Sequence, residues 1–108
     1  MSAPPRLRLV APSRISTLAR SFPTLADVEA CEPFDPAALA EWTRGPAATS
    51  GGLHAARFLL SLWSGGNVAP GGLDPWTVGP FDAVAAVASW DDDHRAAFAA
   101  WIAAPWFP

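Results

Sequence analysis

Residues 53–63 read Leu-His-Ala-Ala-Arg-Phe-Leu-Leu-Ser-Leu-Trp, and this stretch decides the fold of the chain. Its polar residues include His54, Arg57 and Ser61, and their spacing places them on one narrow face of a helix. The other positions are alanine, leucine, phenylalanine and tryptophan. A helix that is apolar around most of its circumference needs other helices to cover it. Residues 53–63 are therefore predicted to form the central helix of a small bundle.

Helix-start and helix-stop residues mark further segments on both sides of the central helix. Ser13 is placed to cap a first helix, and Thr24 begins a capping-box pattern that predicts a second one. Asp35, followed directly by a proline, starts a third helix, and either Thr49 or Ser50 caps the central one. The predicted helices cover residues 14–21, 24–31, 36–45, 53–63, 81–89 and 92–103.

These segments predict an all-α fold, a small bundle of about five or six short helices around residues 53–63. With 108 residues, of which 51% are hydrophobic and 16% charged, the chain is expected to form one folded domain. Residues 14–108 are assigned to that domain, and residues 1–13 to an extended basic arm because prolines interrupt them. No apolar run is long enough to span a membrane, so no membrane partner is expected.

The cysteine content favours a reducing compartment. Cys31 is the one cysteine of the chain, so neither a disulfide nor a cysteine-based zinc site is expected. The residue is predicted to be a small buried apolar side chain and not a nucleophile. A cytoplasmic location follows as the simplest expectation.

Charge is unevenly distributed along the chain. Residues 1–25 carry four arginines and no acidic residue, whereas the net charge of the whole chain is −3. Three interpretations remain open for a basic arm on an acidic body: it folds back, it contacts an acidic partner chain through Arg6 and Arg8, or it binds nucleic acid. Nucleic-acid binding has the weakest support, because no helix-turn-helix or zinc pattern accompanies the arginines.

Two stretches have the composition of interaction segments. The segment 64–80 is rich in glycine and proline, and Leu73 and Trp76 are its anchoring candidates. At the C-terminal end of the sequence, Trp106 and Phe107 follow the last helix. They either dock on their own chain, which is the expected outcome, or form an exposed anchor for a partner or a second copy.

The last two predicted helices carry apolar residues on shared faces. The helix over residues 81–89 is predicted to carry Asp82 in its first turn, with Phe81 and Val84 on one shared face. In the following helix, Trp101 and Ile102 are predicted to pack, together with Phe98, on the central helix.

The residues best suited to metal binding or acid–base catalysis form one polar group. Asp92 and His94 could join His54 around a divalent metal ion, and His54 with Arg57 could form an acid–base pair. Consecutive aspartates are nevertheless what a helix start selects electrostatically, and a polar stripe on a helix is usually a set of ion pairs. Neither a metal site nor a cofactor is therefore predicted.

No stretch carries a recognised catalytic motif, and no catalytic residue is assigned. The preferred hypothesis is a small non-enzymatic protein-interaction module, of bacterial, plasmid or phage type, that binds another protein or itself. The alternative is a small metal-dependent or acid–base enzyme that uses His54, Arg57, Asp92 and His94. A weaker alternative is nucleic-acid binding through the N-terminal arginines.

Overall fold

The computed structural model describes residues 13–64 and 78–108, and this part of the chain is all-α. The predictions for residues 1–12 and 65–77 lie outside the described residues. The prediction of an all-α fold is confirmed for the described part. Its elements are α2 (Arg14–Ser21), the 3-10 helix η1 (Pro23–Leu25), α3 (Pro36–Trp42), α4 (Ser50–Trp63), α5 (Ala83–Ser89) and α6 (Asp92–Ala103).

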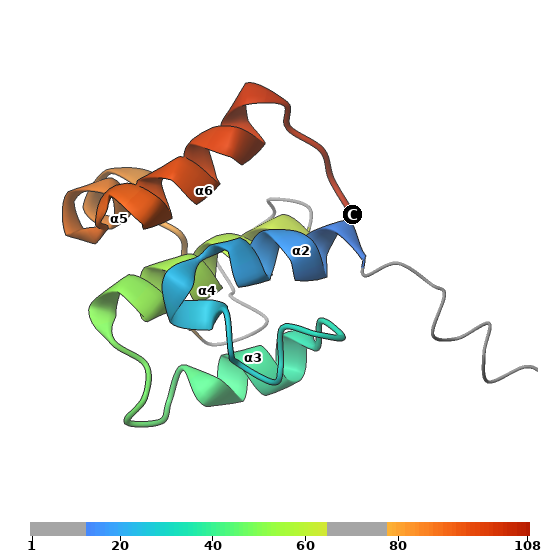
Figure 1. Ribbon diagram of the computed structural model, residues 1–108. Coiled ribbons are helices and arrows are strands. Elements are labelled where there is room, and N and C mark those ends of the chain that lie inside the picture. The colour runs from blue at the N-terminus through green and yellow to red at the C-terminus, as the bar shows by residue number, and fades with distance from the viewer. Residues whose placement is uncertain (1–12, 65–77) are drawn as a thin grey trace, which may run out of the picture.

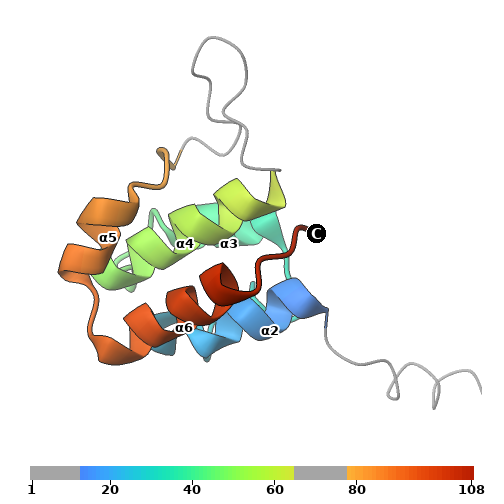
Figure 2. The ribbon, with the colours of Figure 1, turned by 90° about the horizontal axis from the view of Figure 1, so that it is seen from above.

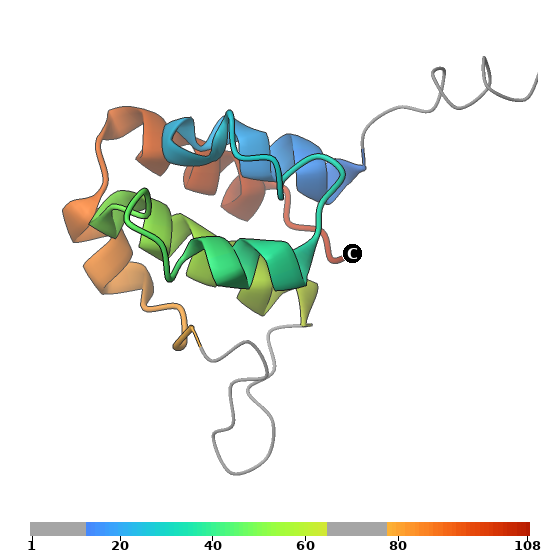
Figure 3. The ribbon, with the colours of Figure 1, turned by 90° about the horizontal axis from the view of Figure 1, so that it is seen from below.

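The helices lie in three levels, which Figure 1 shows from the side. The α5–α6 pair covers one side of α4 and α2, and α3 covers the other (Figures 1 and 3). Helix α4 contacts η1, α2, α3 and α5, and α2 also packs against α6. Seen from above, the start of α2 and the ends of α4 and α6 meet at one end of the molecule, where the C-terminal tail also lies (Figure 2).

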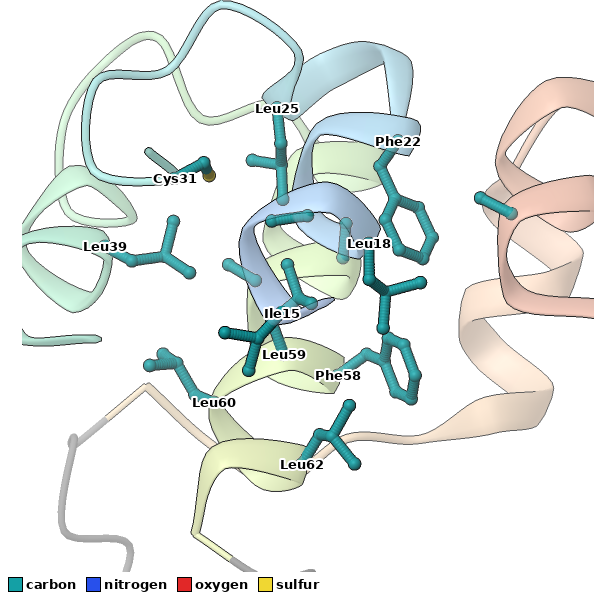
Figure 4. Close-up of a cluster of buried hydrophobic side chains, with 14 of the residues drawn as sticks. Ile15, Leu18, Phe22, Leu25, Cys31, Leu39, Phe58, Leu59, Leu60 and Leu62 are labelled. Carbon is teal, nitrogen blue, oxygen red and sulfur yellow. The ribbon is translucent and has the colours of Figure 1, made fainter. Parts of the chain in front are cut away.

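The core forms around α4, whose most buried large side chain is Leu59 (Figure 4). Helix α2 contributes Ile15 and Leu18 from one direction, and Leu39 arrives from α3 on another. Each large apolar side chain removed from water contributes about 1.5–3 kcal/mol. The α4 residues that belong to this core are Ala55, Ala56, Phe58, Leu59, Leu60 and Leu62.

Side-chain caps start the helices at the places that the sequence predicts. The oxygens of Ser13 and Asp35 accept from the backbone N–H three residues further on, at the starts of α2 and α3. Thr49 does the same for Gly52, so α4 begins at Ser50, three residues before the predicted start. Gly52 is also a point of close approach, because a Cβ there would lie 2.8 Å from the Trp42 ring.

The predicted helix over residues 24–31 is wrong. Only the 3-10 turn Pro23–Leu25 forms, and the chain then continues through turns whose N–H groups bond three residues back, from Leu25 to Glu32. The Thr24 hydroxyl, which was expected to cap a helix, lies instead 2.8 Å from Nε2 of His94. A tertiary contact therefore replaces the local cap.

Helix α5 begins two residues later than predicted, at Ala83. Asp82 is its N-cap, with extended backbone, and its carboxylate accepts from the N–H of Ala85 at 3.0 Å. The ring of Phe81 packs on Phe58, which ties the preceding residue to the core before the helix starts. Val84, which was expected to share a face with Phe81, is 83% exposed.

Candidate functional site

His94 is buried and has polar partners on both ring nitrogens. Its Nδ1 lies 2.7 Å from Oδ1 of Asp91, and its Nε2 lies 2.8 Å from Oγ1 of Thr24. The Asp91 carboxylate only accepts, so Nδ1 carries the proton and donates it. Nε2 then accepts from the Thr24 hydroxyl and faces the Thr24 backbone N–H at 3.4 Å. Every polar atom of the buried ring is thereby satisfied.

This arrangement joins two segments that lie 70 residues apart in the sequence. The His94 ring also stacks against Trp90 and lies beside Phe22, so it fills the space between η1 and α6. The backbone N–H of His94, followed by its side chain, lowers the pKa of Asp91. A carboxylate, an imidazole and a hydroxyl in series resemble an acid–base relay, but here the imidazole is only 4% exposed and connects two elements.

The other polar residues singled out in the sequence have separate surroundings. The side chain of Asp92 is fully exposed and lies 3.7 Å from the Arg95 guanidinium. Arg57 Nε donates to the backbone oxygen of Val78 at 2.9 Å. Nδ1 of His54 is buried and has no hydrogen-bond partner among the described residues.

Within residues 13–64 and 78–108, no hydrogen bond or ion pair links any two of His54, Arg57, Asp92 and His94. The same residues also contain no group of three or more histidine, cysteine or acidic side chains that could hold a metal ion. The structure thus brings His94 together with Asp91 and Thr24, a contact that the sequence alone did not indicate.

Cys31 is buried, as predicted. Burial raises the pKa of its thiol to about 11, and the charge of Arg20 opposes this shift only in part. Since the thiolate is the reactive form, Cys31 is a poor nucleophile at neutral pH.

The C-terminal tail folds back onto the start of α2 (Figure 1). The indole N–H of Trp101 donates to the backbone oxygen of Trp106 at 2.9 Å, which holds the tail against α6. The Arg14 guanidinium lies 4.6 Å from the centre of the Trp106 ring. Phe107 meets Trp101 edge to face, yet its side chain is 65% exposed. Trp106 is therefore docked on its own chain, whereas Phe107 remains largely open to solvent.

Three hollows surround this tail, with volumes of about 380, 350 and 180 Å³. The largest lies between α2 and α6, and Trp106 and Arg14 also line the second hollow. Phe107 lines both the second hollow and the smallest. We call this region the tail site and define it by Arg14, Phe34, Trp63, Trp101, Trp106 and Phe107.

Several large apolar side chains of α5 and α6 are exposed. Ile102, which was predicted to pack on the central helix, is 52% exposed, because Phe98 and Trp101 occupy the buried side of α6. Val84 and Val87 are exposed on α5. None of the three is predictable as a surface residue from the sequence, because an alanine-rich helix gives little indication of which side faces inward.

Two groups of predicted interaction residues, Arg6 with Arg8 and Leu73 with Trp76, lie outside the described residues. Arg14, Phe34 and Trp63 were not predicted as site residues. The signal that could have pointed to Arg14 is its position in the first turn of a helix that has no acidic residue there.

Among the described residues, no helix is both long enough and apolar enough to span a bilayer. Comparison of the chain with protein-family models, with curated proteins and with solved structures found no significant match. The function must therefore be argued from the geometry of the surface itself.

Proposed function

We propose that this chain is a small non-enzymatic interaction module that binds another protein or itself through α5, α6 and the C-terminal tail. The observation that carries the proposal is the apolar character of this face. Residues 96–108 contain no charged, hydroxyl or amide side chain, although Ile102 and Phe107 are largely exposed. An apolar surface of this kind is typical of a protein–protein interface and unfavourable when left in water.

Helix α5 adds exposed apolar side chains at the end of the molecule opposite to the tail (Figure 2). Val84 and Val87 lie one helical turn apart and both are exposed, so they present apolar groups on the same side of the helix. Arg95 of α6 donates from Nε to the backbone oxygen of Val87 at 2.9 Å, which holds the two helices together there. The surface is thus built on packed helices, and such a support keeps apolar anchors in place for a partner.

In this proposal the described helices form one bundle around α4, and residues 1–13 are a basic arm that contacts the partner through Arg6 and Arg8. Arg6 and Arg8 would then add positive charge at the edge of the interface. Charge at an interface edge mainly increases the rate of association and the specificity for one partner. The proposed setting is the bacterial cytoplasm, including proteins of plasmid or phage origin.

Site-specific photo-crosslinking tests the proposal. A benzophenone amino acid is placed at position 84, 102 or 107 and, as a matched control, at the exposed Glu29 far from α5 in the sequence. After irradiation in the source cells, we expect discrete protein adducts or a crosslinked dimer from the first three positions and none from position 29. Equal crosslinking at all four positions, or no adduct at any, would contradict the proposal.

A further inference from the structure

Arg14 is a cation without an acidic partner in the described residues. The other exposed arginines differ: Arg20 bonds Glu32 at 2.6 Å, Arg44 bonds Glu41 at 2.9 Å, and Arg95 lies 3.7 Å from Asp92. Arg14 instead lies over the Trp106 ring.

The position of Arg14 adds to its positive potential. It is the first residue of α2, and the first turn of that helix contains no acidic residue. The helix macrodipole is positive at this end, so a guanidinium here is unfavourable unless an anion approaches. The surroundings of the Arg14 guanidinium therefore attract a negative charge.

The hollows next to Arg14 are apolar. The two larger ones share Arg14 and Trp106, and Arg14 is the only charged side chain that lines any of the three hollows of the tail site. Glu32 is paired with Arg20, and neither Glu32 nor Asp35 lines any of the three hollows. An occupant of the tail site would consequently meet aromatic and aliphatic side chains, a few serine and threonine hydroxyls, and one guanidinium.

We propose that the tail site binds a peptide segment of another protein in which an aspartate or glutamate lies beside apolar or aromatic side chains. The carboxylate pairs with Arg14, and the neighbouring apolar side chains enter the hollows on either side of Trp106. A peptide fits better than a lipid chain, because the apolar space is shared among three hollows of about 380, 350 and 180 Å³, of which Trp106 and Phe107 each line two, and because Arg14 offers a carboxylate one charged partner. This inference rests on the proposed function and specifies its partner.

Pools of hexapeptides test the inference on the full chain. One position is fixed as Asp, Asn or Lys, and the others are an equal mixture of Leu, Phe, Pro and Trp. Binding is followed by the indole N–H signals of protein labelled with ¹⁵N-tryptophan, and the Trp101 and Trp106 signals are assigned by Trp→Phe substitution. We expect the Asp pool to shift these two signals and to bind about tenfold more tightly than the Asn pool, a difference of about 1.4 kcal/mol. The Lys pool should bind most weakly.

Two charge-matched variants locate the effect. Arg14→Gln should remove the preference for Asp over Asn, whereas Arg44→Gln, which removes an exposed arginine elsewhere, should preserve it. Since Arg14 is exposed, Arg14→Gln is expected to melt within a few degrees of the wild type, which circular dichroism checks. Equal binding of the Asp and Asn pools, or a preference that survives Arg14→Gln, would overturn the inference.

The outcomes also separate this inference from the proposed function. Crosslinks from positions 84, 102 and 107 without any preference for the Asp pool would leave the interaction module standing and reject its acidic partner. A mass by light scattering that falls from dimer to monomer in Arg14→Gln would assign the tail site to a second copy, and would also overturn the inference. Without crosslinks and without peptide binding, both proposals fail.

Discussion

His94 is predicted to stabilise the fold by linking η1 to α6, and this can be measured by replacing it. His94→Phe keeps an aromatic ring beside Phe22 and Trp90 but removes the polar contacts to Asp91 and Thr24. A net hydrogen bond contributes about 1 kcal/mol. The hydrogen bond between His94 and Asp91 is given this same value although the carboxylate is charged, because that carboxylate is largely exposed to solvent.

Loss of both contacts should therefore cost about 2 kcal/mol of unfolding free energy. For a domain of this size, 1 kcal/mol corresponds to roughly 4–8 °C in Tm, so the variant should melt about 10 °C lower. Urea unfolding followed by far-ultraviolet circular dichroism is the suitable assay, since Trp90 lies against the substituted ring and would disturb a fluorescence signal.

A double-mutant cycle isolates the contact between His94 and Thr24. Thr24→Val replaces the hydroxyl by a methyl group of similar size, and alone it should cost about 1 kcal/mol. The double variant should cost about 1 kcal/mol less than the sum of the two single ones. Asp92→Asn, at a fully exposed side chain nearby, serves as control and should change stability by less than about 0.5 kcal/mol. A coupling energy below about 0.3 kcal/mol would refute the role assigned to His94.

Three further predictions concern glycine, pH and the thiol. In α4, Gly51→Ala should stabilise the protein by about 0.5–1 kcal/mol, because the added Cβ would have ordinary contacts. Gly52→Ala should not stabilise it, because the added Cβ would lie 2.8 Å from the Trp42 ring. Thermal melts that rank the two variants the other way would contradict this prediction. Because the pKa of Asp91 is lowered in the folded state, its stabilisation is complete above the unfolded pKa and is lost as the pH falls through the folded pKa. In urea melts, the difference in unfolding free energy between wild type and Asp91→Asn should therefore be constant from about pH 7 to 5 and shrink below about pH 4. Because the pKa of Cys31 is raised to about 11, its reaction with a chromogenic disulfide at about pH 8 should be at least about 100-fold slower in the folded protein than in urea, and equal rates would show that the thiol is not buried.

The parts of the fold that the sequence predicted are those that depend on neighbouring residues. Ser13, Asp35 and Thr49 cap helices by bonds that reach only three residues along the chain, so their role is readable from the sequence. The central position of α4 follows from its apolar circumference, which must be covered by other helices on most sides.

The errors arose where a distant residue decides the local structure. Thr24 has the pattern of a helix cap, but its hydroxyl bonds His94, and nothing near Thr24 in the sequence indicates that partner. In α5 and α6, alanine dominates, so the inward face is chosen by where Phe58 receives Phe81 and Phe98. Ile102 consequently faces outward, against the prediction, and Val84 is exposed as well.

The tail site shows the same limit. Trp106 is predicted as an interaction residue because of its place after the last helix. Arg14 lies 92 positions before it in the sequence. Their contact depends on α2 and α6 packing side by side, with the start of one near the end of the other (Figures 1 and 2). Sequence pattern alone carries no information on that pairing.

Hydrogen–deuterium exchange of the full chain, measured alone and with the protein that position 107 captures, tests the central claim most directly. The account predicts that the partner slows exchange in the first turn of α2, in α5, and from the second half of α6 through the tail. Exchange in α3, on the opposite side of the bundle, should be unchanged (Figure 1). Slower exchange confined to α3, with none around Arg14 or Trp106, would contradict the claim that the α5–α6 face and the tail form the binding surface.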